Sequence, residues 1–214
     1  MDTGAKVDGH DGHYELDITE PNTYVVYNVN ATTPVTLQKA TYDFPLDPTD
    51  GLPSYPASNS FKGDVTKGVV RNFVLKVTGV KPDDRDYNPP QLDYEGKWHG
   101  AFYGGDVDVQ LANWAPADEQ LELDFTPTAP LIDGSQGKPI TLTAEIPKGR
   151  AGVDVHDIPL GEYSLSAKVN GAPAQVSMKI YGTPVGYETP SASVPIIWVP
   201  DSTTHLSYPT VTVH

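Results

Sequence analysis

The sequence predicts an all-β protein, an antiparallel β-sandwich built from two closely packed units. Three observations predict it. Short segments of alternating apolar and polar residues recur along the 214-residue chain, and the evidence for helices is thin. Turn-forming residues separate the segments, since the chain holds 21 Pro and 19 Gly. An Asn-Gly pair at 170–171 lies between two alternating segments, which is the strongest short-range signal of a β-hairpin.

Four strands are expected in the first part of the chain. Residues 23–29 (TYVVYNV) are dense in β-branched and aromatic side chains, which favour strands. Residues 72–77 (NFVLKV), 106–111 (DVDVQL) and 121–125 (LELDF) alternate apolar with polar or charged positions. This alternation is typical of half-buried strands that keep one face in water.

The second part of the chain has a more regular pattern. Residues 140–146 (ITLTAEI) and 163–169 (YSLSAKV) alternate with period two, and 174–180 (AQVSMKI) follow the Asn-Gly pair. We therefore expect an antiparallel hairpin of 163–169 with 174–180, whose apolar residues face one core. These residues are Tyr163, Leu165, Ala167, Val169, Val176, Met178 and Ile180. A last strand is expected at 208–214 (YPTVTVH), paired with its own sheet or with the open edge of a neighbour.

Irregular segments separate these strands. Residues 43–56 and 81–90 are rich in Pro and are expected to form long surface loops, where binding residues often lie. A single helical turn at 115–120 is the most helix that the sequence supports, because Pro116 and the acids after it are suited to a first turn.

Residues 126–130 (TPTAP) are the candidate domain boundary. They divide the chain into an N-terminal β-sandwich unit, 1–125, and a C-terminal one, 126–214. One strand-exchanging sandwich that uses the same segment as a crossover is the alternative.

Composition excludes several classes of partner. Lys and Arg total 14 against 28 Asp and Glu, giving a formal net charge of −14. We therefore expect no nucleic-acid binding, because phosphate recognition depends on clustered cations. The absence of cysteine excludes disulfides, thiolate zinc sites and cysteine nucleophiles. No apolar segment approaches the ~20 residues of a membrane-spanning helix, so no membrane insertion is expected.

One stretch carries a resemblance to known modules. Residues 157–167, DIPLGEYSLSA, have the form Ile-Pro-x-Gly-x-Tyr-x-Leu-x-Ala, and 11–18, DGHYELDI, are related. The pattern resembles the prealbumin-like sandwich modules of extracellular proteins, namely the carboxypeptidase-regulatory-like and collagen-adhesin B-type repeats. The resemblance implies Ig-like or prealbumin-like β-sandwich units and an extracytoplasmic or surface setting. Ala167 stands where adhesin repeats often place a Glu, so no internal isopeptide bond is expected.

The N-terminal stretch VDGHDGHYELDI contains a possible metal site. Imidazole and carboxylate groups are good ligands for zinc and other divalent ions. The candidate ligands are Asp8, His10, Asp11 and His13. The alternative, which we favour, is a solvated turn that leads into a strand. We therefore expect no cofactor.

An aromatic segment offers a possible glycan site. Sugar-binding sandwiches present aromatic rings to pyranose faces and place polar side chains beside them. The residues of this candidate platform are Tyr94, Trp98, Tyr103, Asp106 and Trp114. The competing interpretation places the large rings in the hydrophobic core, as is usual for such side chains.

No motif indicates catalysis. The chain lacks a Gly-x-Ser-x-Gly nucleophile turn and a phosphate-binding glycine loop, and His156, Asp157 and Ser135 do not define a triad by sequence. The leading expectation is a non-enzymatic structural or surface subunit, at a cell surface, on an appendage or in a virion. Such a subunit works through protein partners or self-assembly. The alternative is a carbohydrate-binding module of an extracellular glycan-degrading system.

Overall fold

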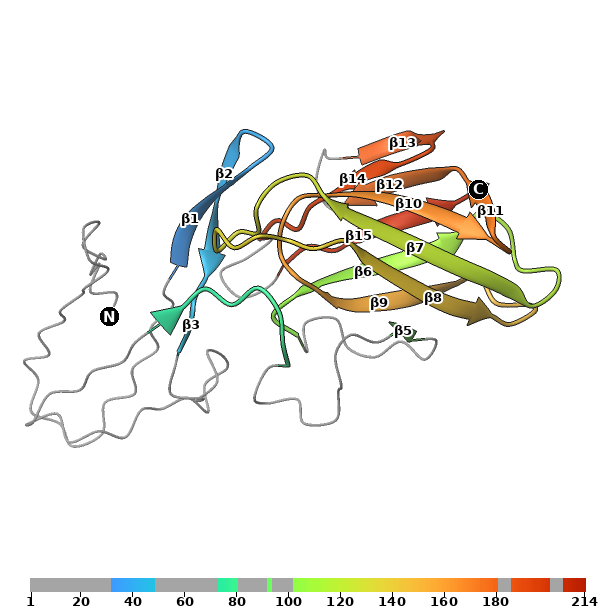
Figure 1. Cartoon of the computed structure of the whole chain (residues 1–214), viewed down its shortest axis with the longest axis horizontal. Coiled ribbons are helices and arrows are strands. Elements are labelled where there is room, and N and C mark those ends of the chain that lie inside the picture. Colours follow the sequence, from blue (N-terminus) through green and yellow to red (C-terminus); the bar gives the residue numbers. More distant parts are fainter. Residues whose placement is uncertain (1–31, 49–72, 81–91, 94–101, 181–185, 201–205) are drawn as a thin grey trace, which may run out of the picture.

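The computed structural model describes residues 32–48, 73–80, 92–93, 102–180, 186–200 and 206–214. Within these ranges the regular secondary structure is entirely β (Figure 1). In the same ranges there is no helix long and apolar enough to cross a membrane. The all-β prediction is therefore confirmed for the described part of the chain.

The larger main sheet has six strands in the order β13-β12-β15-β6-β9-β5. Its strands are β5 (Leu92–Asp93), β6 (Gly105–Leu111), β9 (Gly152–Ile158), β12 (Val176–Ile180), β13 (Gly186–Ser191) and β15 (Pro209–Val213). All neighbours in this sheet are antiparallel except β15 and β6, which run parallel. The C-terminal strand thus lies inside the sheet, between β12 and β6.

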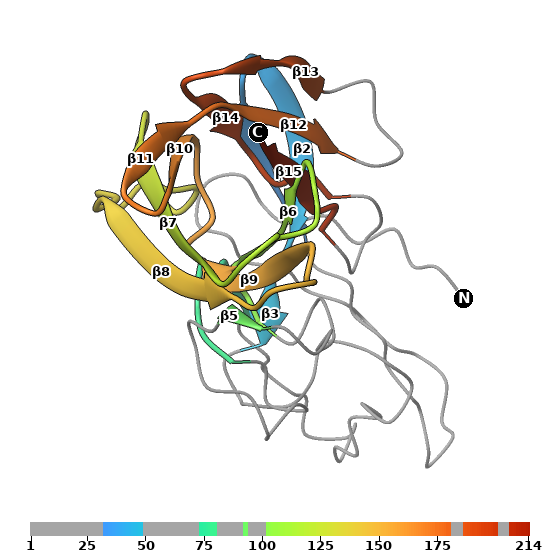
Figure 2. The same ribbon diagram turned by 90° about the vertical axis from the view of Figure 1, so that its right-hand side faces the viewer.

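The second main sheet has five strands. They are β7 (Glu119–Pro127), β8 (Ile140–Ile146), β10 (Tyr163–Val169), β11 (Ala172–Ala174) and β14 (Val194–Ile196). The order is β11-β10-β7-β8, and β14 also pairs with β10. All these pairs are antiparallel. Figure 2 shows the two main sheets facing each other, with β8 and β9 at one side.

Two small sheets precede the main ones. A hairpin is formed by β1 (Thr32–Leu37) and β2 (Ala40–Pro45), and a short pair by β3 (Asp47–Pro48) and β4 (Phe73–Val74). Gln38 and Lys39 make the hairpin turn with positive φ angles of 46° and 70°. Leu37 and Phe44 from this hairpin are buried in the main hydrophobic core, so the hairpin is packed against the large sheets.

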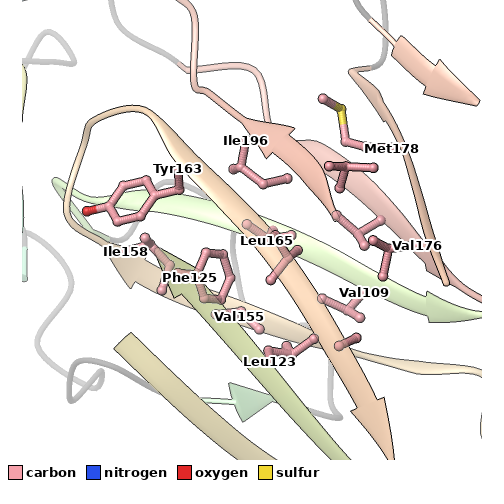
Figure 3. Close-up of a cluster of buried hydrophobic side chains, with 14 of the residues drawn as sticks. Val109, Leu123, Phe125, Val155, Ile158, Tyr163, Leu165, Val176, Met178 and Ile196 are labelled. Atoms are coloured by element: carbon pink, nitrogen blue, oxygen red, sulfur yellow. The ribbon is translucent and has the colours of Figure 1, made fainter. Parts of the chain in front are cut away.

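Alternate residues of both main sheets point into one core (Figure 3). On β7 and β10 the inward positions are fully buried while the positions between them are partly exposed, as period-two strands require. Core residues drawn in Figure 3 come from strands of the two sheets: Val109, Leu123, Phe125, Val155, Ile158, Leu165, Val176, Met178 and Ile196, together with Tyr163.

Trp198 connects the two sheets at one end of this core. Its indole Nε1–H donates to the backbone oxygen of Asp106 on β6 at 2.8 Å. Its ring lies edge-on to Tyr163 of β10, with 6.0 Å between ring centroids. The ring also covers Gly105, where a methyl group would overlap the indole. Glycine at 105 therefore allows the large ring to pack directly on the backbone.

Most of the strands that the sequence predicts are confirmed. Residues 106–111 lie in β6, 121–125 in β7, 140–146 form β8 and 163–169 form β10. The predicted last strand within 208–214 is β15, and it pairs with its own sheet.

Some local predictions are wrong. Part of the loop expected at 43–56 is strand, because β2 extends to Pro45 and Asp47–Pro48 form β3. Of the described residues 73–77 in the predicted strand 72–77, only Phe73 and Val74 form a strand, although Leu75 and Val77 pack against the core. The alternation of apolar residues in this segment therefore reflects side chains that pack on the core, although residues 75–77 pair with no strand. No helical turn forms at 115–120, because backbone hydrogen bonds hold Ala115 to the β8–β9 turn and β7 begins at Glu119. The strand expected at 23–29 lies outside the described residues.

The Asn-Gly hairpin forms, but the predicted pairing of 163–169 with 174–180 is wrong, because the second strand is Ala172–Ala174 and 176–180 lies in the other sheet. Asn170 and Gly171 have φ angles of 52° and 77°, as a type I′ turn requires. Only Ala172–Ala174 pair with β10, and the chain then crosses to the other sheet as β12. Pro173 lacks the N–H that a ladder uses, and β14 occupies the remaining edge of β10. The apolar residues of both segments still share one core.

Both main sheets combine strands from the two sides of residue 125. β7 spans Glu119–Pro127 and so crosses the expected boundary, while β6 pairs with β9 and β15. The described strands that precede and follow the boundary therefore contribute to the same hydrophobic core.

Replacing Gly105 with Ala is expected to reduce the free energy of unfolding by about 3 kcal/mol, because the added methyl overlaps the buried indole of Trp198. Urea unfolding followed by Trp fluorescence measures this change. Gly186→Ala is the matched control, since a methyl there meets its neighbours at ordinary distances of 3.5 Å and more. The control is expected to change stability by less than about 0.5 kcal/mol. Equal effects of the two substitutions would contradict this account of Gly105.

Candidate contact site

Trp114 lies on the loop between β6 and β7 and is the most exposed large hydrophobic residue in the described part of the chain. The residue is 70% exposed, and the next most exposed is Tyr187 at 42%. The loop leaves the β6–β9 ladder after Leu111 and returns at Ala115, whose own side chain is buried. Residues 112–114 therefore protrude from the end of the sheets, with Trp114 in water.

Backbone hydrogen bonds hold this loop on both sides. Ala112 N–H donates to Val213 O at 2.8 Å, which ties the loop to the C-terminal strand. Ala115 N–H donates to Arg150 O at 3.0 Å and Ala115 O accepts from Gly149 N–H at 2.9 Å. The β8–β9 turn and β15 thus support the segment that carries Trp114. An exposed ring on a supported loop loses little conformational entropy when a partner covers it.

The β8–β9 turn that supports the Trp114 loop carries charged residues, and so does the segment before β7. Lys148 and Arg150 are exposed on the turn whose backbone pairs with Ala115. The Asp118 carboxylate accepts a hydrogen bond from the backbone N–H of Lys148 at 2.8 Å. The turn that supports the Trp114 loop thus carries two exposed cationic residues, and the Asp118 carboxylate holds its backbone. Residues 112–118 and 147–150 together form the contact site.

A second group of polar residues lies at the opposite end of β6 and is buried. His156 Nδ1 and Asp106 Oδ1 are joined by a hydrogen bond of 2.9 Å, and both residues are buried. Phe102 stacks on the His156 ring with centroids 5.6 Å apart. Because the pair is enclosed by an aromatic ring and the sheet, we assign it to the stability of the fold.

Asp157 organises the backbone around this pair. Its Oδ1 accepts hydrogen bonds from the N–H groups of Gly79 (2.8 Å) and Gly104 (3.1 Å). Its Oδ2 accepts from the Thr78 hydroxyl at 3.0 Å. Burial raises the pKa of the Asp157 carboxyl above its ordinary 3.8, and the charge of Asp106 acts in the same direction, while the three hydrogen bonds oppose the shift.

Three residues of the predicted glycan platform, Tyr103, Asp106 and Trp114, lie in the described part of the chain, and the structure places Trp114 apart from the other two. Tyr103 is 8% exposed, and its hydroxyl accepts a hydrogen bond from Lys76 Nζ at 3.0 Å. Asp106 is 7% exposed and bonded to His156. Tyr103 precedes β6 and Asp106 lies near its start, whereas Trp114 follows its last residue. A strand of this length separates its two ends by roughly 20 Å. Tyr94 and Trp98 lie outside the described residues.

The proposed metal ligands Asp8, His10, Asp11 and His13 also lie outside the described residues. Within the ranges that the structure describes, no group of three or more His, Cys, Asp or Glu side chains is arranged to hold a metal ion.

Sequence reasoning missed Trp198 and the hydrogen-bonding role of Asp157. Trp198 lies in the apolar segment 194–199 (VPIIWV). An apolar segment indicates that its side chains are buried, but it does not indicate which residues they contact. Asp157 has a φ of 59°, and Asp is among the few residues that tolerate this conformation. The contacts of both residues join segments far apart in the sequence, which local patterns do not reveal.

Comparison with known proteins finds no relative. No protein-family description, curated protein or solved structure matches this chain.

Two substitutions of Asp157 distinguish the effect of its hydrogen bonds on stability from the effect of its charge. Asp157→Ala removes the acceptor of two N–H groups and one hydroxyl and should reduce the free energy of unfolding by about 3 kcal/mol at pH 7. Asp157→Asn keeps a carbonyl acceptor and tolerates positive φ, so its stability should stay within about 1 kcal/mol of the parent. Urea unfolding tests both variants. An Asn variant as unstable as the Ala variant would show that the charge itself is required.

The raised pKa of Asp157 should also make the free energy of unfolding depend on pH. A native-state pKa above 3.8 means that the folded chain retains a proton which the unfolded chain has released. The contribution of Asp157 to stability therefore falls as the pH rises from 3.8 through the raised pKa. Asp157→Asn lacks this part of the slope, so the stability of the parent relative to the variant should decrease over this window. An unchanged difference would contradict the raised pKa.

Proposed function

We propose that this chain is a non-enzymatic structural or surface subunit that works through protein contacts, and that Trp114 lies at the centre of a partner interface. The observation that carries the proposal is the 70% exposure of Trp114 on a loop held by hydrogen bonds to β15 and to the β8–β9 turn. Burying a Trp ring on a partner gains a large apolar contact, and a fixed loop lowers the entropic cost.

The neighbours of Trp114 support a protein partner. Trp and Arg are the residues most enriched among energetically dominant interface positions, and Arg150 is exposed on the turn that supports Trp114. The contact site also contains the polar residues Asp118 and Lys148, and interfaces commonly combine a central aromatic residue with a polar rim. The buried His156 and Asp106 are held in place by the fold, and this proposal gives them no catalytic role.

The proposed setting is outside the cell, at a cell surface or in a virion, and the proposed fold is an Ig-like or prealbumin-like sandwich. Two features support the fold. β6 and β9 are neighbours in one sheet while β7 and β10 are neighbours in the other, as in Ig-like sandwiches. Tyr163 at the start of β10 donates its hydroxyl to Pro159 O at 2.8 Å, like the tyrosine corner of such domains. The parallel β15 departs from that pattern.

A carbohydrate-binding module is the second candidate, and the exposure of Trp114 favours it too. A single exposed indole can stack on a pyranose ring. Asp106, the carboxylate of the predicted glycan set, is buried near the other end of β6 and so does not orient a sugar on Trp114. Protein contact therefore remains the leading proposal.

Trp114→Ala is expected to abolish partner binding while changing the free energy of unfolding by less than about 0.5 kcal/mol, because the ring is largely in water. The immobilised parent and variant are incubated with extract and surface fractions of the source, and retained proteins are compared by mass spectrometry. Tyr187→Ala is the matched control, an exposed aromatic residue on β13.

The proposal predicts a protein that the parent and Tyr187→Ala retain and Trp114→Ala loses. Identical retention by all three chains would contradict a contact centred on Trp114. A glycan array with the same variants tests the second candidate, and glycan binding that depends on Trp114 would replace the leading proposal.

A further inference from the structure

The outer edges of the two main sheets differ in how they are protected against pairing with another chain. An open strand edge pairs readily with a foreign strand unless it is short or carries proline or charge. β5 has two residues. β13 carries Glu188 and Pro190. β11 and β14 share one edge, have three residues each and contain Pro173 and Pro195. Three of the four edges are therefore protected.

β8 lacks this protection. It is the last strand of the order β11-β10-β7-β8 and runs for seven residues, Ile140–Ile146, without proline. Its sequence, ITLTAEI, has a single charged residue, Glu145. In the part of the chain that the structure describes, its ladder partner is β7 alone. The side of β8 away from β7 thus offers backbone donors and acceptors to a further strand.

We propose that β8 pairs antiparallel with β8 of a second copy of this chain and joins the two five-stranded sheets across a twofold axis. A twofold axis makes each residue meet its symmetry-related position, so the strand must be complementary to itself. This inference extends the proposed contact function by naming a partner, a second copy. It uses the free edge of β8, which ends at Ile146, directly before residues 147–150 of the contact site.

The strand is self-complementary when the axis passes through Thr143. Thr143 then faces Thr143 of the second copy, and Thr141 faces its Glu145, which combines hydroxyl and carboxylate groups without opposing like charges. On the inner face Leu142 meets Ala144 and Ile140 meets Ile146. Leu142 and Ile140 are only half-buried in the single chain, so the pairing covers further apolar surface.

Charge also favours this edge for self-association. Each chain carries a formal net charge of −14, so two copies repel each other and a stable contact needs a seam with little charge. The β8 edge meets this need, because its one carboxylate faces a Thr hydroxyl in the proposed register. The repulsion should be screened by salt, so dimerisation is expected to strengthen as ionic strength rises.

The test is a charge swap at Thr143, followed by sedimentation velocity over a range of concentrations. Thr143→Lys and Thr143→Glu each place like charges on the twofold axis and should weaken dimerisation by about tenfold or more. Mixing the two variants pairs Lys with Glu and should restore dimers. Thr126→Lys is the matched control, an exposed Thr on the central strand β7 that is expected to leave dimerisation unchanged.

The outcomes are distinguishable from those of the proposed function. A parent chain that stays monomeric at every concentration and salt overturns the β8 pairing and leaves the Trp114 contact to its own test. If Trp114→Ala abolishes the dimers and the Thr143 variants still form them, the β8 pairing is also overturned, and a contact through Trp114 is supported. If a charged variant fails to fold, Thr143→Cys replaces it, because the chain has no other cysteine. Mild oxidation should then link two Thr143→Cys copies more readily than two Thr126→Cys copies. Linkage of Thr143→Cys that is no more efficient than that of Thr126→Cys overturns the pairing.

Discussion

The packing of Trp198 on the bare backbone of Gly105 is the contact on which the rest of the structure depends. The indole joins β6 through its hydrogen bond to Asp106 O and joins β10 through Tyr163, so one side chain connects both main sheets. Tyr163 is itself held by a hydrogen bond to Pro159 O. These contacts set the relative position of β6 and β10, and the loops at the far ends of the strands are placed accordingly.

The C-terminal strand extends this constraint to the proposed contact site. β15 lies parallel to β6 and continues to a hydrogen bond between Val213 O and Ala112 N–H, beside Trp114. A core formed by both sheets thus supports an exposed ring at one end, while the buried carboxylate of Asp157 organises the other end. The sheets work as a rigid support, and the proposed functional surfaces, the Trp114 loop and the β8 edge, lie at its periphery.

Local sequence patterns predicted the strands well and their partners poorly. Alternation identified β6, β7, β8 and β10, because burial of one face alone produces that pattern. The Asn170–Gly171 turn followed from its need for positive φ. The crossing of 176–180 to the other sheet was missed, because the same alternating residues suit either sheet. Of the predicted site residues, the structure shows Trp114 exposed and Tyr103 and Asp106 buried. Residue type alone does not predict this difference.

Hydrogen–deuterium exchange of backbone amides tests most directly the claim that a rigid two-sheet core holds Trp114 on a fixed loop. The account predicts that the N–H groups of Ala112, Ala115 and Gly149 are protected nearly as strongly as the ladder amides of β6 and β15, because all three donate to backbone oxygens. Exchange of these loop amides at the rate of an unstructured chain, with β6 and β15 still protected, would contradict a preformed contact site.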